Sequence, residues 1–336
     1  MNSKKDKLVN FLTNKPVIIW GARMTGMGFL RFSTSNNLNV LNFVDSDPAL
    51  FGKKVNNTTV KAPNDLALLK QLNPNLIIVI AVSIKEDEII KELKIMGFTD
   101  DDFVLYSDYC VVFYTIDIVG TCNLRCASCV YSIEGQKYSK GLMSLEDFKL
   151  VVSKMKNEVD IVTHVSLYNW GEPFLHPELN KIISHLHENG IAAAVSTHLS
   201  IVTGGQIRKV IKAAPEYLKI SLSGYYPNEY DVTHAGGDIN LVKSNLYRIR
   251  YFIDQFKSNT LVDVNYHLYT NNNGKNLKKM QELCDELDFS LSTVNSLVMP
   301  VERVIDYVEG KDEVRTSELN KILPVSIEEG MSVASD

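Results

Sequence analysis

Short apolar segments of strand length alternate with segments of helix length along most of this chain. Strands that alternate with helices are typical of parallel sheets, because each helix carries the chain back to the end where the next strand begins. The first third therefore predicts an α/β domain with a parallel sheet at residues 1–108. The expected strands are 17–20, 40–44 and 76–82, and the expected helical stretches are 29–35, 66–72 and 86–96.

A second and longer alternation begins at Val111. Six βα units in a row predict a partial (β/α)6 barrel of the TIM type at residues 109–310. The tail at 311–336 is polar and weakly patterned. The expected strands are 111–118, 161–167, 192–196, 218–222, 262–267 and 289–293, and the expected helices are 145–156, 177–189, 206–213, 240–256 and 276–287.

Three of the five cysteines, Cys122, Cys126 and Cys129, lie within eight residues of one another. An odd count, clustered in a chain of this length, argues for metal rather than for a disulfide framework. Thiolates select iron–sulfur clusters or zinc. Three local thiolates leave one iron of a 4Fe–4S cluster without a protein ligand, as a catalytic site requires. The loop follows the first barrel strand, at the end where barrel active sites form.

Two alternatives compete with a catalytic cluster, namely a structural zinc knuckle and a closed electron-transfer cluster that uses Cys110 as fourth ligand. No fourth Cys or His stands at zinc spacing beside the three cysteines. Cys110 precedes the first barrel strand, so we expect it at the opposite end of the barrel. The sequence thus favours an open cluster over both alternatives.

The stretch from Cys122 to Cys129, which begins Cys-Asn-Leu-Arg-Cys, resembles the CxxxCxxC signature of the radical S-adenosylmethionine (SAM) superfamily. Three later segments also resemble that family, over residues 111–300 in total. Asn169-Trp170-Gly171-Glu172-Pro173 is similar to its Gly-Gly-Glu-Pro segment, apart from the first two residues. Ser196-Thr197-His198 is similar to Ser-Thr-Asn, with His198 replacing Asn, and Ile220-Ser221-Leu222-Ser223-Gly224 is similar to a Ser-Leu-Asp-Gly segment, with Ser223 replacing Asp.

The resemblance implies the cofactors and the chemistry. Cys122, Cys126 and Cys129 would hold a 4Fe–4S cluster whose open iron chelates SAM. An electron from the cluster, supplied by a partner such as flavodoxin or ferredoxin, would cleave SAM to a 5′-deoxyadenosyl radical that abstracts hydrogen from a small organic substrate. A sugar or nucleotide sugar is one candidate substrate. The residues that the resemblance implies for SAM binding are Gly171, Glu172, Pro173, Ser196, Ser221 and Ser223.

The only cysteine after Cys129 is Cys284. Family members with SPASM or twitch extensions carry several more cysteines for auxiliary clusters, so this chain is expected to hold one cluster. Cys284 shares a helical spacing of three or four residues with Leu277, Met280 and Leu287. That spacing predicts a cysteine facing a hydrophobic core.

The segment Gly21-x-Arg23-x-x-Gly26 follows the first strand, and Asp45 ends the second. This imitates a dinucleotide fingerprint, so the domain at residues 1–108 resembles a Rossmann-like parallel sheet. Arg23, however, stands where a glycine normally lets the backbone approach a pyrophosphate. We expect either a docking domain that has lost its cofactor or a site where Arg23 binds another anion, such as a sugar nucleotide. Tight turns also require glycine without any ligand.

The charge balance is mildly acidic, with 35 basic and 40 acidic side chains and a net charge of −5. This gives no general reason to bind nucleic acid or an anionic membrane. The N-terminus lacks the pattern of a secretory signal, so a cytoplasmic location is the expectation. Two alternative functions remain, namely a nucleotide-dependent oxidoreductase with an electron-transfer cluster and a binding module with a structural metal.

Overall fold

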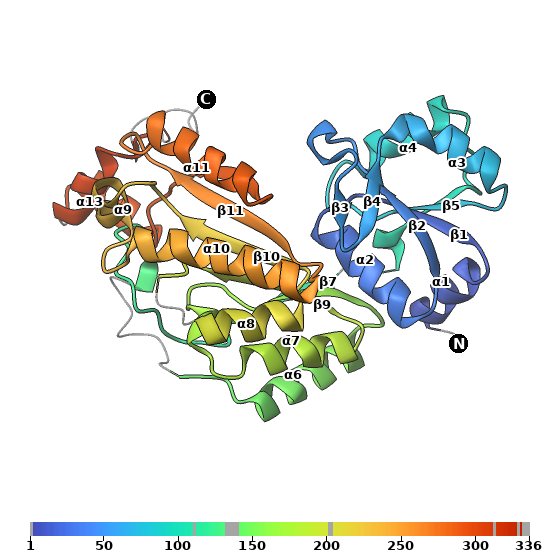
Figure 1. Ribbon diagram of the computed structural model, residues 1–336, viewed down its shortest axis with the longest axis horizontal. Coiled ribbons are helices and arrows are strands. Elements are labelled where there is room, and N and C mark those ends of the chain that lie inside the picture. Colours follow the sequence, from blue (N-terminus) through green and yellow to red (C-terminus); the bar gives the residue numbers. More distant parts are fainter. Residues whose placement is uncertain are drawn as a thin grey trace.

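The computed structural model describes residues 3–109, 112–131, 141–200, 204–311, 314–327 and 330. It contains two six-stranded sheets, one after the other along the chain (Figure 1). This confirms the α/β class. Cys110 lies outside the described residues, and the domain limits stay a prediction.

The first sheet has the strand order β3-β4-β2-β1-β5-β6 and is parallel except for the β3–β4 pair. Its central strand β1 is an apolar run, Val17 to Trp20, that is buried on both faces, as expected of a parallel sheet covered by helices. The elements are α1 (Lys4–Leu12), β1 (Pro16–Trp20), α2 (Met24–Ser35), β2 (Asn39–Val44), β3 (Lys54–Val55), β4 (Thr58–Lys61), α3 (Leu66–Leu72), β5 (Ile77–Ile80), α4 (Glu86–Ile95) and β6 (Phe103–Leu105).

The second sheet keeps its strands in chain order from β7 to β12, all parallel, with β7 and β12 at its two edges. This confirms a partial (β/α)6 barrel. Its strands are β7 (Val112–Thr115), β8 (Val162–Ser166), β9 (Ala192–Thr197), β10 (Tyr217–Leu222), β11 (Leu261–Leu268) and β12 (Ser290–Asn295). Its helices are α6 (Leu145–Glu158), α7 (Leu179–Glu188), α8 (Gly204–Ala213), α9 (Pro227–Thr233), α10 (Ile239–Phe256), α11 (Lys275–Glu286), α12 (Glu302–Val308) and α13 (Val314–Asn320).

Alternation along β10 decides which side chains reach the interior of the barrel. Leu218, Ile220 and Leu222 are buried in the core between the strands and the outer helices. Because strand side chains alternate, Lys219 and Ser221 project to the inner side of the sheet. The outer core also contains Cys284, which is fully buried on α11 as predicted.

Helix α2 joins the two units, since it packs against β8 and β9 of the barrel (Figure 1). The sequence predicts a glycine-rich turn over 21–28 and a helix only from Phe29, but the helix begins at Met24. Gly28 is required there because a Cβ atom at this position would lie 2.5 Å from the Thr163 carbonyl oxygen. None of the described helices is long and apolar enough to cross a bilayer.

Candidate active site

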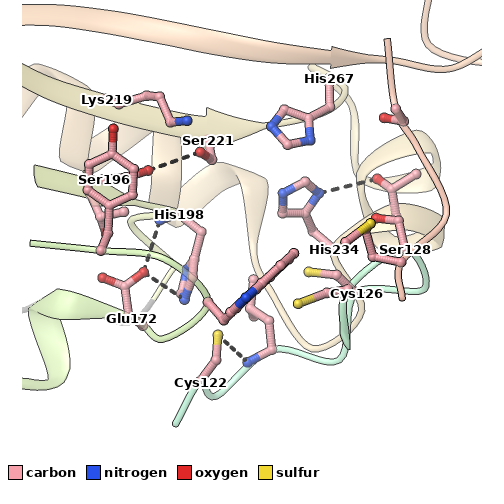
Figure 2. Close-up of a pocket in the computed structure, with 18 of the residues that line it drawn as sticks. Cys122, Cys126, Ser128, Glu172, Ser196, His198, Lys219, Ser221, His234 and His267 are labelled. Atoms are coloured by element: carbon pink, nitrogen blue, oxygen red, sulfur yellow. Dashed lines mark hydrogen bonds and ion pairs between the residues drawn. The ribbon is translucent and has the colours of Figure 1, made fainter. Parts of the chain in front are cut away.

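Most of the predicted site residues meet in one cavity of about 380 Å³ at the carboxyl ends of the barrel strands (Figure 2). Barrel active sites are built at this end. Pro173 and Ser223, by contrast, do not line the cavity. The predicted residues that line it are Cys122, Cys126, Cys129, Gly171, Glu172, Ser196 and Ser221.

The cysteine loop is held by its own backbone and by the chain after α9. The Leu124 N–H points to the Cys122 sulfur at 3.4 Å, and the Arg125 N–H donates to the Ala235 carbonyl at 2.9 Å. Burial raises the pKa of the Cys122 thiol to about 11, and burial together with the neighbouring sulfurs raises the pKa of Cys126 further. Thiolates at these positions therefore need a positively charged centre to compensate them.

The donor set fits a cluster, because all three candidate ligands are cysteines that line one cavity. Among the described residues, no three His, Cys, Asp or Glu side chains converge as the ligands of a single ion do. The cysteines of a 4Fe–4S cluster each bind a different iron, so their sulfurs surround the cluster instead of meeting at one point. Cys122, Cys126 and Cys129 line one cavity and leave its other walls to different residues.

Asp117, which the sequence analysis missed, positions the segment at 169–173. Its carboxylate accepts the backbone N–H groups of Asn169, Trp170 and Gly171 at 3.0–3.3 Å. Gly171 also passes so close to the first barrel loop that a Cβ atom would lie 1.8 Å from the Val119 carbonyl oxygen. A glycine at this position therefore has a packing reason, and no local sequence signal marks Asp117 as its partner.

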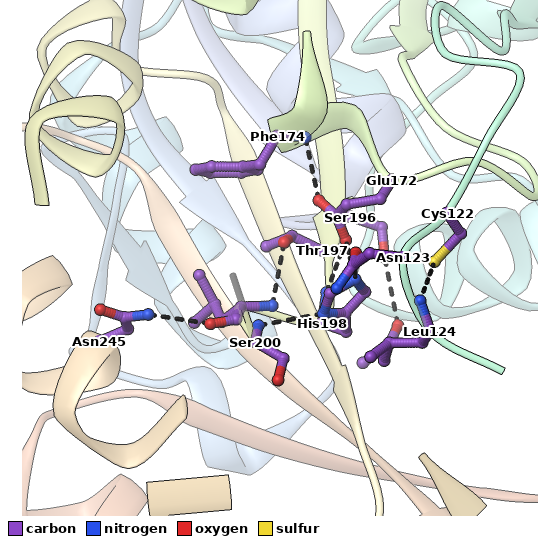
Figure 3. Close-up of polar contacts among 12 residues, drawn as sticks. Cys122, Asn123, Leu124, Glu172, Phe174, Ser196, Thr197, His198, Ser200 and Asn245 are labelled. Atoms are coloured by element: carbon purple, nitrogen blue, oxygen red, sulfur yellow. Dashed lines mark hydrogen bonds and ion pairs between the residues drawn. The ribbon is translucent and has the colours of Figure 1, made fainter. Parts of the chain in front are cut away.

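The Glu172 carboxylate and His198 form a buried bridge between three loops (Figures 2 and 3). Glu172 accepts the N–H of Phe174 at 2.9 Å and that of His198 at 3.1 Å. The His198 Nδ1 accepts the Ser200 N–H at 3.0 Å, so Nε2 carries the proton. Nε2 lies 3.0 Å from Asn123 Oδ1, in the cysteine loop, and 3.1 Å from the Glu172 carboxylate. The His198 side chain thus has partners for both ring nitrogens, which favours a structural role at the cavity wall.

The predicted serines divide into two groups. The Ser196 and Ser221 hydroxyls, on β9 and β10, lie 3.2 Å apart and face the cavity (Figure 2). The structure differs from the prediction for Ser223, which is fully buried and contacts Thr233 and His234 Nδ1. Strand β10 ends at Leu222, so the alternation that turns Ser221 inward does not extend to Ser223.

Lys219 and His267 also reach the cavity from the inner side of the barrel (Figure 2). Tyr168 lines the cavity beside Lys219. The Lys219 ammonium lies 5.3 Å from the centre of the Tyr168 ring. Burial lowers the pKa of Lys219, although the Asp263 carboxylate opposes this. A partly desolvated cation beside a cavity favours an anionic or strongly polar ligand group. Strand alternation could have identified Lys219, since it lies two residues before Ser221.

The C-terminal segment supports the cysteine loop from outside. Arg303 on α12 is buried, and its Nη1 donates to the carbonyl of Ala127 at 2.9 Å and to that of Met299 at 3.1 Å. The Met299 N–H donates to the Ser128 carbonyl at 3.2 Å. Ala127 and Ser128 stand between Cys126 and Cys129, so this segment fixes the part of the loop that carries two of the thiols.

The cysteine loop and the segments that face it lie within a region that matches a known protein family. Residues 116–287, more than half of the chain, match the model of the family described as the radical SAM superfamily. The chain belongs to the radical SAM superfamily. Members of this superfamily are enzymes that use a 4Fe–4S cluster and SAM, and they act on small-molecule or peptide substrates with a reductant. The radical SAM region begins just after β7 and includes the cysteine loop and the Gly171–Pro173 segment.

Two curated proteins and one solved structure show what this chain is similar to over part of its length. A probable GTP 3′,8-cyclase of Methanococcus maripaludis is 26% identical over 133 residues, 40% of this chain and 43% of that protein. An Fe-coproporphyrin III synthase of Methanosarcina barkeri is 24% identical over 103 residues, 31% of this chain and 25% of that protein. SuiB of Streptococcus suis, solved with its precursor peptide SuiA, has a TM-score of 0.47 and 14% identity over 73% of this chain and 49% of that one. The chain thus spans less than half the length of each.

Proposed function

We propose that this radical SAM enzyme cleaves SAM reductively and abstracts a hydrogen atom from an organic substrate in the barrel. When bound, the cluster supplies the electron that divides SAM into methionine and a 5′-deoxyadenosyl radical. One hydrogen atom of a substrate C–H bond would pass to that radical, which would leave 5′-deoxyadenosine and a substrate radical. The observation that carries the proposal is that the three cysteines line the same cavity as four residues expected to bind SAM. These four are Gly171, Glu172, Ser196 and Ser221.

The roles of the residues follow from their places. Cys122, Cys126 and Cys129 would hold the cluster. The backbone at Gly171 and Glu172, which line the cavity, would bind the amino group of SAM, because Asp117 fixes that segment beside the cysteine loop. The paired hydroxyls of Ser196 and Ser221 are suited to the polar groups of SAM, including its ribose.

The substrate would lie against the interior wall, where Lys219, His267 and Tyr168 offer a cation, an imidazole and a phenol. These groups support a polar metabolite with hydroxyl, carboxylate or phosphate groups, and a sugar or nucleotide sugar fits that description. Because the cluster needs a low-potential electron, we also propose a flavodoxin-type or ferredoxin-type reductant and a cytoplasmic location.

The test is the formation of 5′-deoxyadenosine by anaerobically reconstituted protein with SAM and dithionite, measured by chromatography. The wild-type chain is expected to release 5′-deoxyadenosine, and Cys126→Ala is expected to release none. Cys284→Ala is the matched control, since Cys284 is buried in the outer core and should not affect the product. An electron-transfer cluster or a structural metal would give no 5′-deoxyadenosine from the wild-type chain, and that result would refute the proposal.

A further inference from the structure

The inner wall of the barrel cavity carries a cation that lacks a counter-ion. Lys219, on β10, lines the cavity. Its ammonium forms no hydrogen bond or ion pair with any residue that the structure describes. The Tyr168 ring lies 5.3 Å from the ammonium. A ring face attracts a cation, but it does not replace the oxygen acceptors that the three N–H groups of an ammonium would have in water.

The candidate counter-ion within the barrel is Asp263, which stands directly beside Lys219 in the register of β10 and β11. Its carboxylate, however, already accepts the Tyr217 hydroxyl at 2.6 Å and the Ser292 hydroxyl at 2.7 Å. Asp263 is buried and does not line the cavity. Its charge opposes the effect of burial on Lys219, yet the net pKa of Lys219 is lowered. The protein therefore compensates this ammonium only in part.

His267, on β11, offers a neutral polar group to the same space. Figure 2 shows the Lys219 side chain pointing toward the His267 ring. Burial and the Lys219 charge lower the pKa of His267 to about 4, so the imidazole is uncharged at pH 7. Its ring nitrogens make no hydrogen bond with the described part of the chain, and neither is sealed off from the cavity. A neutral imidazole can donate one hydrogen bond and accept another.

The position of Lys219 along β10 separates it from the groups expected to hold SAM. Lys219 precedes Ser221 by two residues on the same strand. It therefore lies about 6–7 Å further from the carboxyl end of the strand, where the cysteine loop is. The cysteine loop follows β7 and Gly171 follows β8, whereas β9 stands between those strands and β10. Lys219 is thus placed for a molecule that lies deeper in the barrel than the SAM ribose.

We propose that Lys219 selects an anionic substrate, a metabolite whose carboxylate or phosphate group pairs with its ammonium while His267 hydrogen-bonds a neighbouring polar group. This inference rests on the proposed function, since it assumes that the substrate occupies this cavity. A charge pair is stronger in a partly desolvated cavity than in water, because the effective dielectric constant is lower. A neutral sugar would leave the ammonium without a counter-ion inside the barrel and is therefore disfavoured.

The test measures whether anions protect Lys219 from chemical modification in cluster-loaded protein without SAM. Formaldehyde with a borane–amine reductant methylates free amines, and mass spectrometry gives the rate at each lysine. Lys91, an exposed lysine on α4, is the internal control. We expect phosphate or acetate at about 20 mM to slow the methylation of Lys219 by at least about 3-fold relative to Lys91, because a paired ammonium is a poor nucleophile. Glycerol at the same concentration should have no effect. Stronger protection by phosphate would indicate a phosphorylated substrate, and stronger protection by acetate a carboxylic acid.

A variant distinguishes a substrate site from a SAM site. Lys219→Met removes the ammonium and keeps an unbranched side chain, and Lys91→Met is the matched control. In calorimetry, both variants should bind SAM within about 2-fold of the wild-type affinity, because other residues hold SAM. A loss of about 10-fold or more in Lys219→Met alone would assign the ammonium to SAM and overturn the proposal.

Three outcomes of the methylation experiment would also overturn it. They are a Lys219 that does not react, a rate that neither anion slows, and equal protection by glycerol. If Lys219→Met fails to fold by circular dichroism, the methylation rates of the wild-type chain decide alone. Neither measurement requires SAM cleavage, so a failure here leaves the proposed reaction intact. A chain that released no 5′-deoxyadenosine would refute the proposed reaction without changing these results.

Discussion

A buried ion pair between Arg31 and Glu216 joins the two units, so we expect its removal to lower the stability of the fold. Glu216, just before β10, is 2% exposed and contacts Arg31 on α2 through both Nε, at 2.7 Å, and Nη2. The same carboxylate accepts the Ala193 N–H at 2.7 Å and contacts His187 Nε2 at 3.1 Å. The perturbation is Arg31→Met, which keeps most of the side-chain volume and removes the charge.

The expected cost follows from burial. Removing one partner of a buried ion pair costs about 3–5 kcal/mol, because the other charge is left uncompensated. The Arg31 side chain retains 28% exposure and His187 remains near Glu216, so solvent and the imidazole recover part of the loss. We therefore expect a loss of about 2–3 kcal/mol in unfolding free energy. For a chain of this size that corresponds to a fall of about 5 °C in melting temperature.

The assay is urea denaturation followed by circular dichroism, with Lys279→Met as the control. Lys279 pairs with Glu282 at 2.6 Å on the surface of α11, and exposed pairs contribute at most about 1 kcal/mol. Glu216→Leu combined with Arg31→Met should be less destabilising than the sum of the two single variants, because the pair is removed together. A loss in Arg31→Met no larger than in Lys279→Met would refute the argument that this pair joins the units.

Acid should act on the same pair. Burial alone raises the pKa of Glu216, but the His187 hydrogen bond, the Arg31 charge and the Ala193 N–H outweigh it, so the net pKa lies below 4.5. A carboxylate whose folded pKa is depressed stabilises the fold above its unfolded pKa and loses that contribution as pH falls through the folded value. The stability difference between wild type and Glu216→Gln should therefore shrink below about pH 4.5, and a difference that grew on acidification would contradict this sign.

The remaining predictions concern the active site. Ser221→Ala should weaken SAM binding about 5-fold in calorimetry, since one hydrogen bond contributes about 1 kcal/mol, and an unchanged affinity would place the SAM hydroxyls elsewhere. Gly171→Ala should abolish SAM binding and lower iron retention, because the added Cβ would displace Val119, three residues before Cys122; normal affinity would contradict this. Arg303→Met should speed the loss of iron to a chelator several-fold, because the Ala127 carbonyl loses its donor; an equal rate would show that the C-terminal segment does not support the loop.

The barrel could be predicted from the sequence because its strands are apolar runs at regular spacing. All six expected barrel strands are present, and the ends differ by a few residues. The alternation inside one strand is equally local, and it places Ser221 and Lys219 on the same side. Elements with few buried residues were missed. Strand β3 has two residues, and α13 falls in a tail whose sequence is polar and weakly patterned.

The missed site residues act through contacts that only the fold creates. Asp117 reaches three N–H groups more than 50 residues away in sequence, and Arg303 reaches a carbonyl 176 residues away. No spacing rule relates such positions. Ser223 was assigned to SAM binding by its resemblance to a family segment, but β10 ends at Leu222, the chain turns at Gly224 with φ of +94°, and Ser223 is buried against Thr233 and His234.

The most direct test of the whole account is the state of the iron in anaerobically reconstituted protein. Three cysteines around one cavity predict about four iron and four sulfide per chain, together with an electron paramagnetic resonance signal of the reduced protein that changes when SAM is added. The change is expected because three protein thiolates leave one iron open to SAM. Stoichiometric zinc without iron uptake, or a reduced-cluster signal that SAM leaves unchanged, would contradict the account.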